Sequence, residues 1–151
     1  MHAIVLAVWA GLSLDNITVV ENQIQPYIQE ALDVIEFITG SVETKNGALR
    51  ASLGYPKPWK LRYVEVGNED NLNNNLGTYT SYRFPAFLKA INQKFPDIIV
   101  LSSTSHNIMS IPKPAGGDYH EYTMPDNFVN KFHFFDNLTV PTIVGEYPPL
   151  R

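Results

Sequence analysis

Two glutamates that lie far apart in the chain each end a short run of strand-forming residues. Glu69 is near the end of Leu61–Asp70 (Leu-Arg-Tyr-Val-Glu-Val-Gly-Asn-Glu-Asp), and Glu146 is near the end of Thr142–Tyr147 (Thr-Ile-Val-Gly-Glu-Tyr). Alternation along the first run puts Glu65 and Glu69 on one face. Reactive groups of α/β sheets gather at the carboxyl ends of the strands. The two runs therefore predict a carboxylate pair, although either glutamate alone is also typical of a solvated strand end or a helix cap.

A third run brings further reactive side chains together. Asp118-Tyr119-His120-Glu121-Tyr122 has the pattern of a short strand, so Asp118, His120 and Tyr122 share one face. Asp118 and His120 are metal-ligand types, but no third ligand follows at a convincing spacing, and we predict no metal and no cofactor. Taken alone, His120 also fits a satisfied structural histidine. The other histidines, His2, His106 and His133, are interpreted as structural or exposed.

Five strand-like segments must position these residues. They are His2–Ala10, Leu61–Asp70, Ile98–Ser102, Asp118–Tyr122 and Thr142–Tyr147. The first is a continuous apolar run, which is typical of a parallel strand covered on both faces. We interpret the strands as alternating strictly with four helical connections, which predicts an α/β fold with a parallel sheet and right-handed crossovers.

The clearest helix covers Ile24–Ile38, where apolar residues recur at steps of three and four before Gly40. A second helix is expected over Tyr79–Phe95, with its regular part starting near Pro85. A third is expected to start after a capping Thr123 and to run to about Phe135, burying three phenylalanines. Those are Phe128, Phe132 and Phe135. Between the first helix and the second strand, Val42–Lys60 is interpreted as a long connection.

Composition limits the possible classes of protein. The 151 residues suffice for one domain, and 44% of them are hydrophobic. The formal net charge is −4, with lysines and arginines scattered singly, which argues against a nucleic-acid partner. Cysteine is absent. The apolar stretch Ala3–Leu14 is too short to span a bilayer and lacks the basic start of a signal peptide, so we predict a buried strand and no membrane partner. Oligomeric state cannot be read from the chain.

Several sequence blocks, taken in order, resemble the fungal-type α-L-arabinofuranosidases of glycoside hydrolase family 51. The blocks are Ala7-Val8-Trp9-Ala10-Gly11-Leu12-Ser13-Leu14, Gly67-Asn68-Glu69-Asp70, Ser102-Ser103-Thr104, Asp118-Tyr119-His120-Glu121-Tyr122 with Pro125-Asp126, and Val144-Gly145-Glu146-Tyr147. The resemblance covers nearly the whole chain. It implies an incomplete (β/α)8 TIM barrel, about strands three to seven, with residues 1–151 forming part of the catalytic domain.

The resemblance also implies roles for individual residues. Glu69 would match the acid/base, Glu146 the nucleophile, and Asn68 the neighbour that hydrogen-bonds the sugar. His120 and Tyr122 would line the site, and both share one strand face, as pore-lining residues should. Two further sets remain open: Trp9 either stacks on a sugar ring or closes the rim of the barrel, and the carboxylates Glu65 and Asp70 are interpreted as supporting or structural groups.

The expected chemistry is retaining glycoside hydrolysis without a cofactor. Two carboxyl groups about 5 to 5.5 Å apart would act in turn as nucleophile and as acid/base, which releases terminal α-L-arabinofuranosyl residues. The partner would be an arabinose-containing polysaccharide or oligosaccharide such as arabinoxylan or arabinan. Two other readings stay open: a truncated, non-catalytic remnant that still binds such glycans, and an incomplete fragment without a stable function.

The expected departures from the family are at the two ends of the chain. Strands one, two and eight of a complete barrel have no counterpart in the sequence, and Tyr147–Arg151 differs from the usual continuation. An open sheet would leave two unpaired edges. The resemblance implies an extracellular protein, and Asn16-Ile17-Thr18 and Asn137-Leu138-Thr139 are glycosylation sequons.

Overall fold

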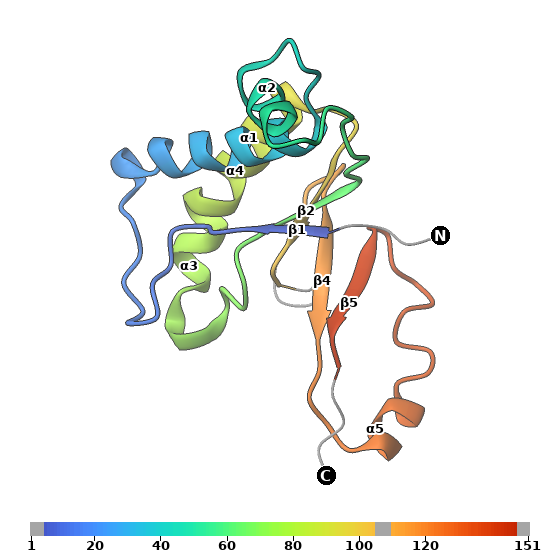
Figure 1. Ribbon diagram of the computed structural model, residues 1–151. Coiled ribbons are helices and arrows are strands. Elements are labelled where there is room, and N and C mark those ends of the chain that lie inside the picture. Colours follow the sequence, from blue (N-terminus) through green and yellow to red (C-terminus); the bar gives the residue numbers. More distant parts are fainter. Residues whose placement is uncertain (1–4, 105–109, 148–151) are drawn as a thin grey trace.

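Five parallel strands form one sheet, and their order in space follows their order in the chain. A computed structural model describes residues 5–104 and 110–147 (Figure 1). The strands are β1 (Val5–Val8), β2 (Tyr63–Val66), β3 (Ile99–Ser102), β4 (Gly116–His120) and β5 (Thr142–Glu146). Each strand pairs in parallel with its neighbour in sequence. The prediction of five parallel strands is confirmed.

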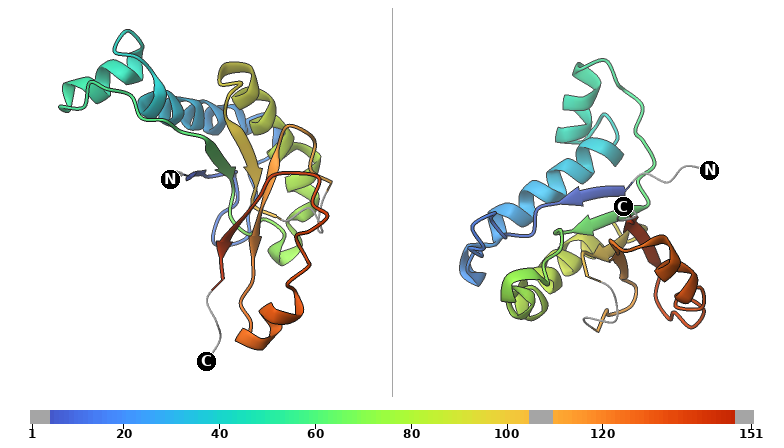
Figure 2. Two further views of the ribbon diagram at one scale, coloured as in Figure 1. Left: turned by 90° about the vertical axis from the view of Figure 1, so that its right-hand side faces the viewer. Right: turned by 90° about the horizontal axis from the view of Figure 1, so that it is seen from below.

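The sheet curls into part of a barrel. Figure 2 shows the strands following a curve, with the large helices α1, α2 and α4 on its outer side and α5 near β4 and β5. The helices are α1 (Gln25–Thr39), α2 (Lys45–Ser52), α3 (Leu76–Thr78), α4 (Phe84–Lys94) and α5 (Pro125–Asn130). A π-helical turn, Tyr79–Arg83, joins α3 to α4, and 3-10 turns cover Glu21–Gln23 and Leu72–Asn74. None of the described helices is long and apolar enough to cross a membrane.

The hydrophobic core lies between the outer face of the first three strands and helices α1 and α4. Val64, Val66 and Val100 from the strands pack with Ile35 of α1 and Ile91 of α4, and all five are almost fully buried. Beyond residue 101, the core cluster of the described residues contains only Ile111 and Ala115. Packing is therefore concentrated in the first two thirds of the chain.

The segment Val42–Lys60 is more than the connection that we predicted, because it contains α2. Thr44 caps this helix by accepting a hydrogen bond from the Gly47 amide at 3.2 Å. Arg50 of α2 is fully buried and donates hydrogen bonds to the carbonyls of Phe37 and Tyr55. The helix is mostly polar and is held by these contacts, so its sequence lacks the apolar spacing by which helices are recognised.

The predicted last helix is wrong in its start, its length and its packing. Met124, and not Thr123, occupies the cap position without a side-chain bond, and α5 ends at Asn130. Phe132 is 77% exposed and Phe135 is 37% exposed, whereas Phe128 is half-buried. Phe135 instead packs its ring against Tyr119, with 5.4 Å between ring centroids. Among the described residues, no further layer covers this side of α5.

Four strands are shorter in the described residues than the sequence runs suggested, and β4 has the expected length but is shifted toward the N-terminus. Between β3 and β4 the described residues, 103–104 and 110–115, contain bends and turns and no helix. β4 begins at Gly116, two residues before the predicted start, because Gly116 and Gly117 pair with β3. The predicted first strand, His2–Ala10, begins outside the described residues.

Candidate active site

A tight turn after β2 carries Glu69. Gly67 has φ +90° and Glu69 has φ +48°, so the chain reverses direction through left-handed conformations. A Cβ atom at Gly67 would lie 1.8 Å from Asp70 Oδ2, and the turn therefore requires glycine at this position. β2 ends at Val66, and Glu69 reaches the site through this turn. The predicted strand alternation up to Glu69 is corrected accordingly.

The carboxylate of Asp70 stabilises this turn. Its Oδ2 accepts hydrogen bonds from the Asn68 amide and from Ser103 Oγ, both at 2.9 Å. Its Oδ1 forms an ion pair with Arg83, and both side chains are almost completely buried. Arg83 also donates to the Ala10 carbonyl, at 3.2 Å. A single buried ion pair thus ties the loops after β1 and β2 together.

The π-helical turn also contacts the residues that end β2 and follow β3. Tyr79 donates its hydroxyl hydrogen to the Val66 carbonyl at 2.6 Å and accepts from the Ser103 amide at 2.9 Å. Burial raises the pKa of Tyr79 above its ordinary value, so the hydroxyl remains a donor. Tyr79 and Arg83 are four positions apart, so they share one face of this turn, and both are buried. The ends of β2 and β3 are therefore fixed against each other.

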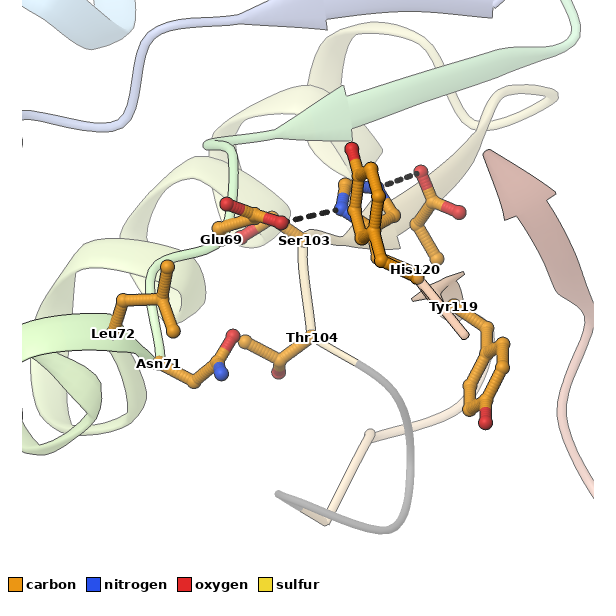
Figure 3. Close-up of a pocket in the computed structure, with 9 residues that line it drawn as sticks. Glu69, Asn71, Leu72, Ser103, Thr104, Tyr119 and His120 are labelled. Carbon is orange, nitrogen blue, oxygen red and sulfur yellow. Dashed lines mark hydrogen bonds and ion pairs between the residues drawn. The ribbon is translucent and has the colours of Figure 1, made fainter. Parts of the chain in front are cut away.

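His120 lies between the two predicted catalytic carboxylates. Its Nδ1 is 3.2 Å from Glu69 Oε1 and 3.8 Å from Glu146 Oε1. A carboxylate oxygen of Glu69, one of Glu146 and a ring nitrogen of His120 all lie within 4.8 Å of one another. Figure 3 shows the imidazole pointing toward Glu69 across the pocket. The structure thus brings Glu69 and Glu146 together at the carboxyl ends of β2 and β5.

Asp118 joins His120 to the strand that carries Glu146. Its Oδ2 is 3.2 Å from His120 Nε2, and its Oδ1 accepts a hydrogen bond from the Gly145 amide at 2.7 Å. A Cβ atom at Gly145 would lie 2.2 Å from Asp118 Oδ2, so a side chain there would displace the carboxylate. The pairing of β4 with β5 shifts its register at Tyr119 and His120, which places His120 opposite Glu146.

On the inner face of the sheet, the surroundings of Glu65 and His120 favour their protonated forms. Burial and then the charge of Asp118 raise the pKa of Glu65 to about 7. Burial of His120 disfavours its charged form, but its hydrogen bond with Glu69 and the negative charges of Asp118 and Glu146 outweigh this, so the pKa of His120 is raised. The site therefore retains protons that isolated side chains would have lost.

A pocket of about 220 Å³ opens in front of these groups. Glu69, His120 and Tyr122 line it, together with Asn71, Leu72, Ser103, Thr104, Asp118 and Tyr119 (Figure 3). Tyr122 lies just beyond the end of β4 and is 46% exposed. Ser103 and Thr104 follow β3, where the sequence indicated only a polar loop.

Asn68 and Trp9 do not join this pocket. Both line a neighbouring hollow of about 330 Å³, between the ends of β1 and β2. Trp9 packs edge-on against Tyr27 at 4.7 Å and donates to the Leu12 carbonyl at 2.5 Å, while remaining 48% exposed. These contacts are typical of a rim residue that still presents part of its ring.

Two groups of three side chains have the spacing of metal ligands. One is Glu65, Asp118 and His120, and the other is Glu69, His120 and Glu146. The histidine in both groups already contacts Glu69 and Asp118 through its two ring nitrogens. Of the remaining histidines, His133 is exposed beside Asp136, and His2 and His106 lie outside the described residues.

Sequence reasoning missed Arg83 entirely and gave Ser103 no role. Arg83 sits in a segment predicted as an ordinary amphipathic helix, in which an arginine is normally solvent-exposed. The available signal was the position of Arg83 directly before Phe84-Pro85-Ala86, where a charged residue interrupts an apolar stretch. The partners Asp70 and Ser103 lie in the segments that follow β2 and β3, so spacing along the chain could not reveal the cluster.

Comparison with known families identifies the family of this chain. A model of the family described as "Alpha-L-arabinofuranosidase 1 domain" matches residues 1–139. The chain belongs to the α-L-arabinofuranosidase family, glycoside hydrolase family 51. It is similar to an arabinose-bound family 51 α-L-arabinofuranosidase of known structure, with 37% identity and a TM-score of 0.80 over 93% of this chain and 23% of that one. The resemblance seen in the sequence and the incomplete TIM-barrel fold are therefore confirmed.

Curated family 51 relatives extend the comparison. The chain is 41% identical to alpha-L-arabinofuranosidase A of Aspergillus kawachii over 95% of its own length, and 37% identical to alpha-L-arabinofuranosidase 2 of Arabidopsis thaliana over 81%. It spans 24% of the length of the Aspergillus protein and 18% of that of the plant protein. The matched region is therefore about a quarter or less of these family members.

Proposed function

We propose that the chain carries the catalytic centre of a retaining glycoside hydrolase that releases terminal α-L-arabinofuranosyl residues. The observation that carries this proposal is the cluster of Glu69, His120 and Glu146 at the carboxyl ends of β2, β4 and β5. A retaining mechanism needs two carboxyl groups about 5 to 5.5 Å apart, and closely spaced carboxylates of this kind are compatible with it. Membership of family 51 supports the substrate class.

In this mechanism Glu146 acts as the nucleophile. Its carboxylate oxygen attacks the anomeric carbon while the glycosidic C–O bond breaks, and Glu69 gives its proton to the departing oxygen. Water then attacks the anomeric carbon of the glycosyl ester, Glu69 takes a proton from that water, and the bond to Glu146 breaks. The sugar leaves with its original configuration because it was inverted twice.

The surrounding residues support this assignment of roles. Glu69 is held by a rigid turn and hydrogen-bonds His120, which suits a group that must exchange a proton in a fixed direction. Tyr122 lines the same pocket and is available to contact the sugar. Asn68 and Trp9 line the adjoining hollow, so we propose that they contact the substrate beyond the reacting sugar ring.

The substrate would be arabinoxylan, arabinan or an arabino-oligosaccharide, and residues 1–151 would form part of a larger barrel domain. An extracellular location belongs to the same proposal and rests on the family resemblance. Both sequon asparagines, Asn16 and Asn137, lie at exposed positions, which is compatible with glycosylation.

Arabinose release from p-nitrophenyl α-L-arabinofuranoside tests the proposal directly. Purified chain with a cooperative thermal transition is compared with Glu69→Gln, Glu146→Gln and the exposed control Glu43→Gln. We expect turnover by wild type and the control, and losses of at least about a thousandfold in both site variants. In Glu69→Ala, azide should restore turnover, because it attacks the glycosyl ester without a general base. A folded chain that releases no arabinose would contradict the proposal.

A further inference from the structure

Glu65 is a buried carboxyl group for which the catalytic cycle has no role. It lies on the inner face of β2 and is only 8% exposed. Its Oε1 has no hydrogen-bond partner, although it is almost inaccessible to solvent. An ionised carboxylate in such a place would be costly, because a buried charge needs partners on both oxygens. The side chain therefore requires an explanation beyond packing.

The neighbours of Glu65 identify what it acts on. Asp118 and His120 of β4 have donor or acceptor atoms that lie within 4.8 Å of the Glu65 carboxyl group and of each other. Glu146 of β5 also contributes its negative charge at Glu65. The side chain thus lies beside one carboxylate and one imidazole and within the electrostatic influence of Glu146.

The distribution of hydrogen bonds shows which carboxyl group holds the proton. Asp118 accepts from the Gly145 amide through Oδ1 and contacts His120 Nε2 through Oδ2, so its ionised form is stabilised on both oxygens. Glu65 has one unpartnered oxygen and no comparable donors. Two adjacent buried carboxylates cannot both be charged cheaply, and the proton therefore resides on Glu65.

We infer that Glu65 is a positioning residue: its protonated carboxyl group donates a hydrogen bond to Asp118, and Asp118 in turn orients His120 and the strand that carries Glu146. The chain of contacts runs from Glu65 to Asp118, from Asp118 to His120 Nε2 and the Gly145 amide, and from His120 Nδ1 to Glu69. Glu65 itself touches neither substrate nor reacting atoms.

This arrangement specifies the tautomer of neutral His120. Because Nε2 faces the Asp118 carboxylate, Nε2 carries the hydrogen and Nδ1 keeps its lone pair toward Glu69. Protonated Glu69 then donates to Nδ1, which aims the carboxyl group while its proton awaits transfer. The consequence for catalysis rests on the proposed function, whereas the proton on Glu65 and the tautomer of His120 do not.

Nuclear magnetic resonance of ¹⁵N-histidine-labelled chain tests the inference without relying on activity. The His120 signals are assigned by their loss in His120→Asn. In wild type we expect the Nε2–H tautomer and a two-step titration, with one step near pH 7 where Glu65 ionises. Glu65→Gln keeps a neutral hydrogen-bond donor, so His120 should retain its tautomer. Because no carboxylate forms at position 65 as the pH rises, His120 should titrate in one step and with a lower pKa than in wild type.

Activity supplies the second readout. Glu65→Leu removes the donor to Asp118, and kcat should fall by about tenfold or more with little change in KM, as expected for the loss of a buried hydrogen bond. Glu65→Gln should stay within about threefold of wild type at pH 5. If Glu65→Leu does not fold, the titration of Glu65→Gln decides alone.

The outcomes separate this inference from the proposed function. A one-step titration of His120 in wild type that Glu65→Gln leaves unchanged would overturn the inference, even in an active enzyme. Equal kcat in Glu65→Leu and wild type would overturn it too. The expected titrations in a chain that releases no arabinose would support the positioning role while the proposed function failed.

Discussion

His120 Nδ1 lies 3.2 Å from Glu69 Oε1, and this contact joins β4 to the turn that follows β2. The histidine belongs to a strand fixed by main-chain pairing, whereas Glu69 is on a turn in a left-handed conformation. The side chain of Glu69 therefore takes its direction from a residue that lies 51 positions away in the chain. The acid/base proposed here depends on this contact for its orientation.

Replacing His120 should impair catalysis more than binding. In His120→Asn, kcat on the aryl arabinofuranoside should fall about tenfold to a hundredfold, because Glu69 loses the partner that aims its proton. KM should change little. His133→Asn is the matched control, since His133 is 82% exposed and pairs with Asp136 away from the site. Steady-state kinetics of the two variants measure the difference, and equal rates would contradict the orienting role.

The buried ion pair between Asp70 and Arg83 should be essential for stability. Asp70→Asn or Arg83→Met leaves one charge buried without its partner, which costs about 3 to 5 kcal/mol. For a chain of this size, Tm should then fall by about 10 °C.

The double variant Asp70→Asn/Arg83→Met should lose less than the sum of the two single losses, because no unpaired charge remains. Lys94→Met provides a control, since Lys94 pairs with Glu36 at a partly exposed position. Additive losses in the double variant would show that the two charges do not stabilise each other.

Gly145 should not tolerate even one added methyl group. A Cβ atom there would lie 2.2 Å from Asp118 Oδ2, so Gly145→Ala should push Asp118 away from His120 and cost about 1 to 3 kcal/mol. Gly77→Ala is the control: its added Cβ has nothing within 4 Å, and in helix α3 it should raise stability by about 0.5 kcal/mol. Thermal melts of both variants report these changes.

Stability should fall as pH rises toward neutrality, and Glu65 should account for part of the fall. Its pKa is raised from 4.5 to about 7 on folding, so the folded state binds more protons than the unfolded state between those values. Stability from this group is thus fully present below pH 4.5 and is lost as pH rises to about 7, by about 2 kcal/mol after solvent screening. His120, whose pKa is also raised, acts in the same direction.

Glu65→Gln isolates this contribution. The amide does not titrate, so the variant should lose less Tm than wild type between pH 5 and pH 7.5, measured in the same buffers. Parallel curves for the two proteins would mean that Glu65 has the same pKa folded and unfolded.

The sequence predicted the parallel sheet and the meeting of Glu69 with Glu146 for a physical reason. Carboxyl ends of parallel strands lie on one edge, so two strand-ending glutamates must approach each other when their strands are close. The roles of the two glutamates stay predictions. The path of Glu69 was not predictable from alternation, because the left-handed turn depends on Asp70 and its distant partners Arg83 and Ser103.

Other expectations failed where packing partners decide the outcome. Phe132 and Phe135 looked like core residues by spacing, yet burial requires a facing layer, and the described chain provides none over α5. Helix α2 escaped prediction because buried Arg50, rather than an apolar stripe, holds it. Trp9 and Asn68 follow the adjacent strands β1 and β2 and line the hollow beside the pocket of Glu69, and for Trp9 a rim position was one of the two predicted alternatives.

Because the hydrophobic core is uneven, the two proposed catalytic glutamates lie at the ends of strands that should differ in how readily they open locally. Glu69 follows β2, whose Val64 and Val66 are fully buried, whereas Glu146 ends β5, whose Val144 is 42% exposed. Backbone amides of β5 should therefore exchange with solvent deuterium much faster than those of β2. A sugar bound between the two glutamates would slow exchange mainly in β5, so substrate would complete the ordering of the half that carries the nucleophile.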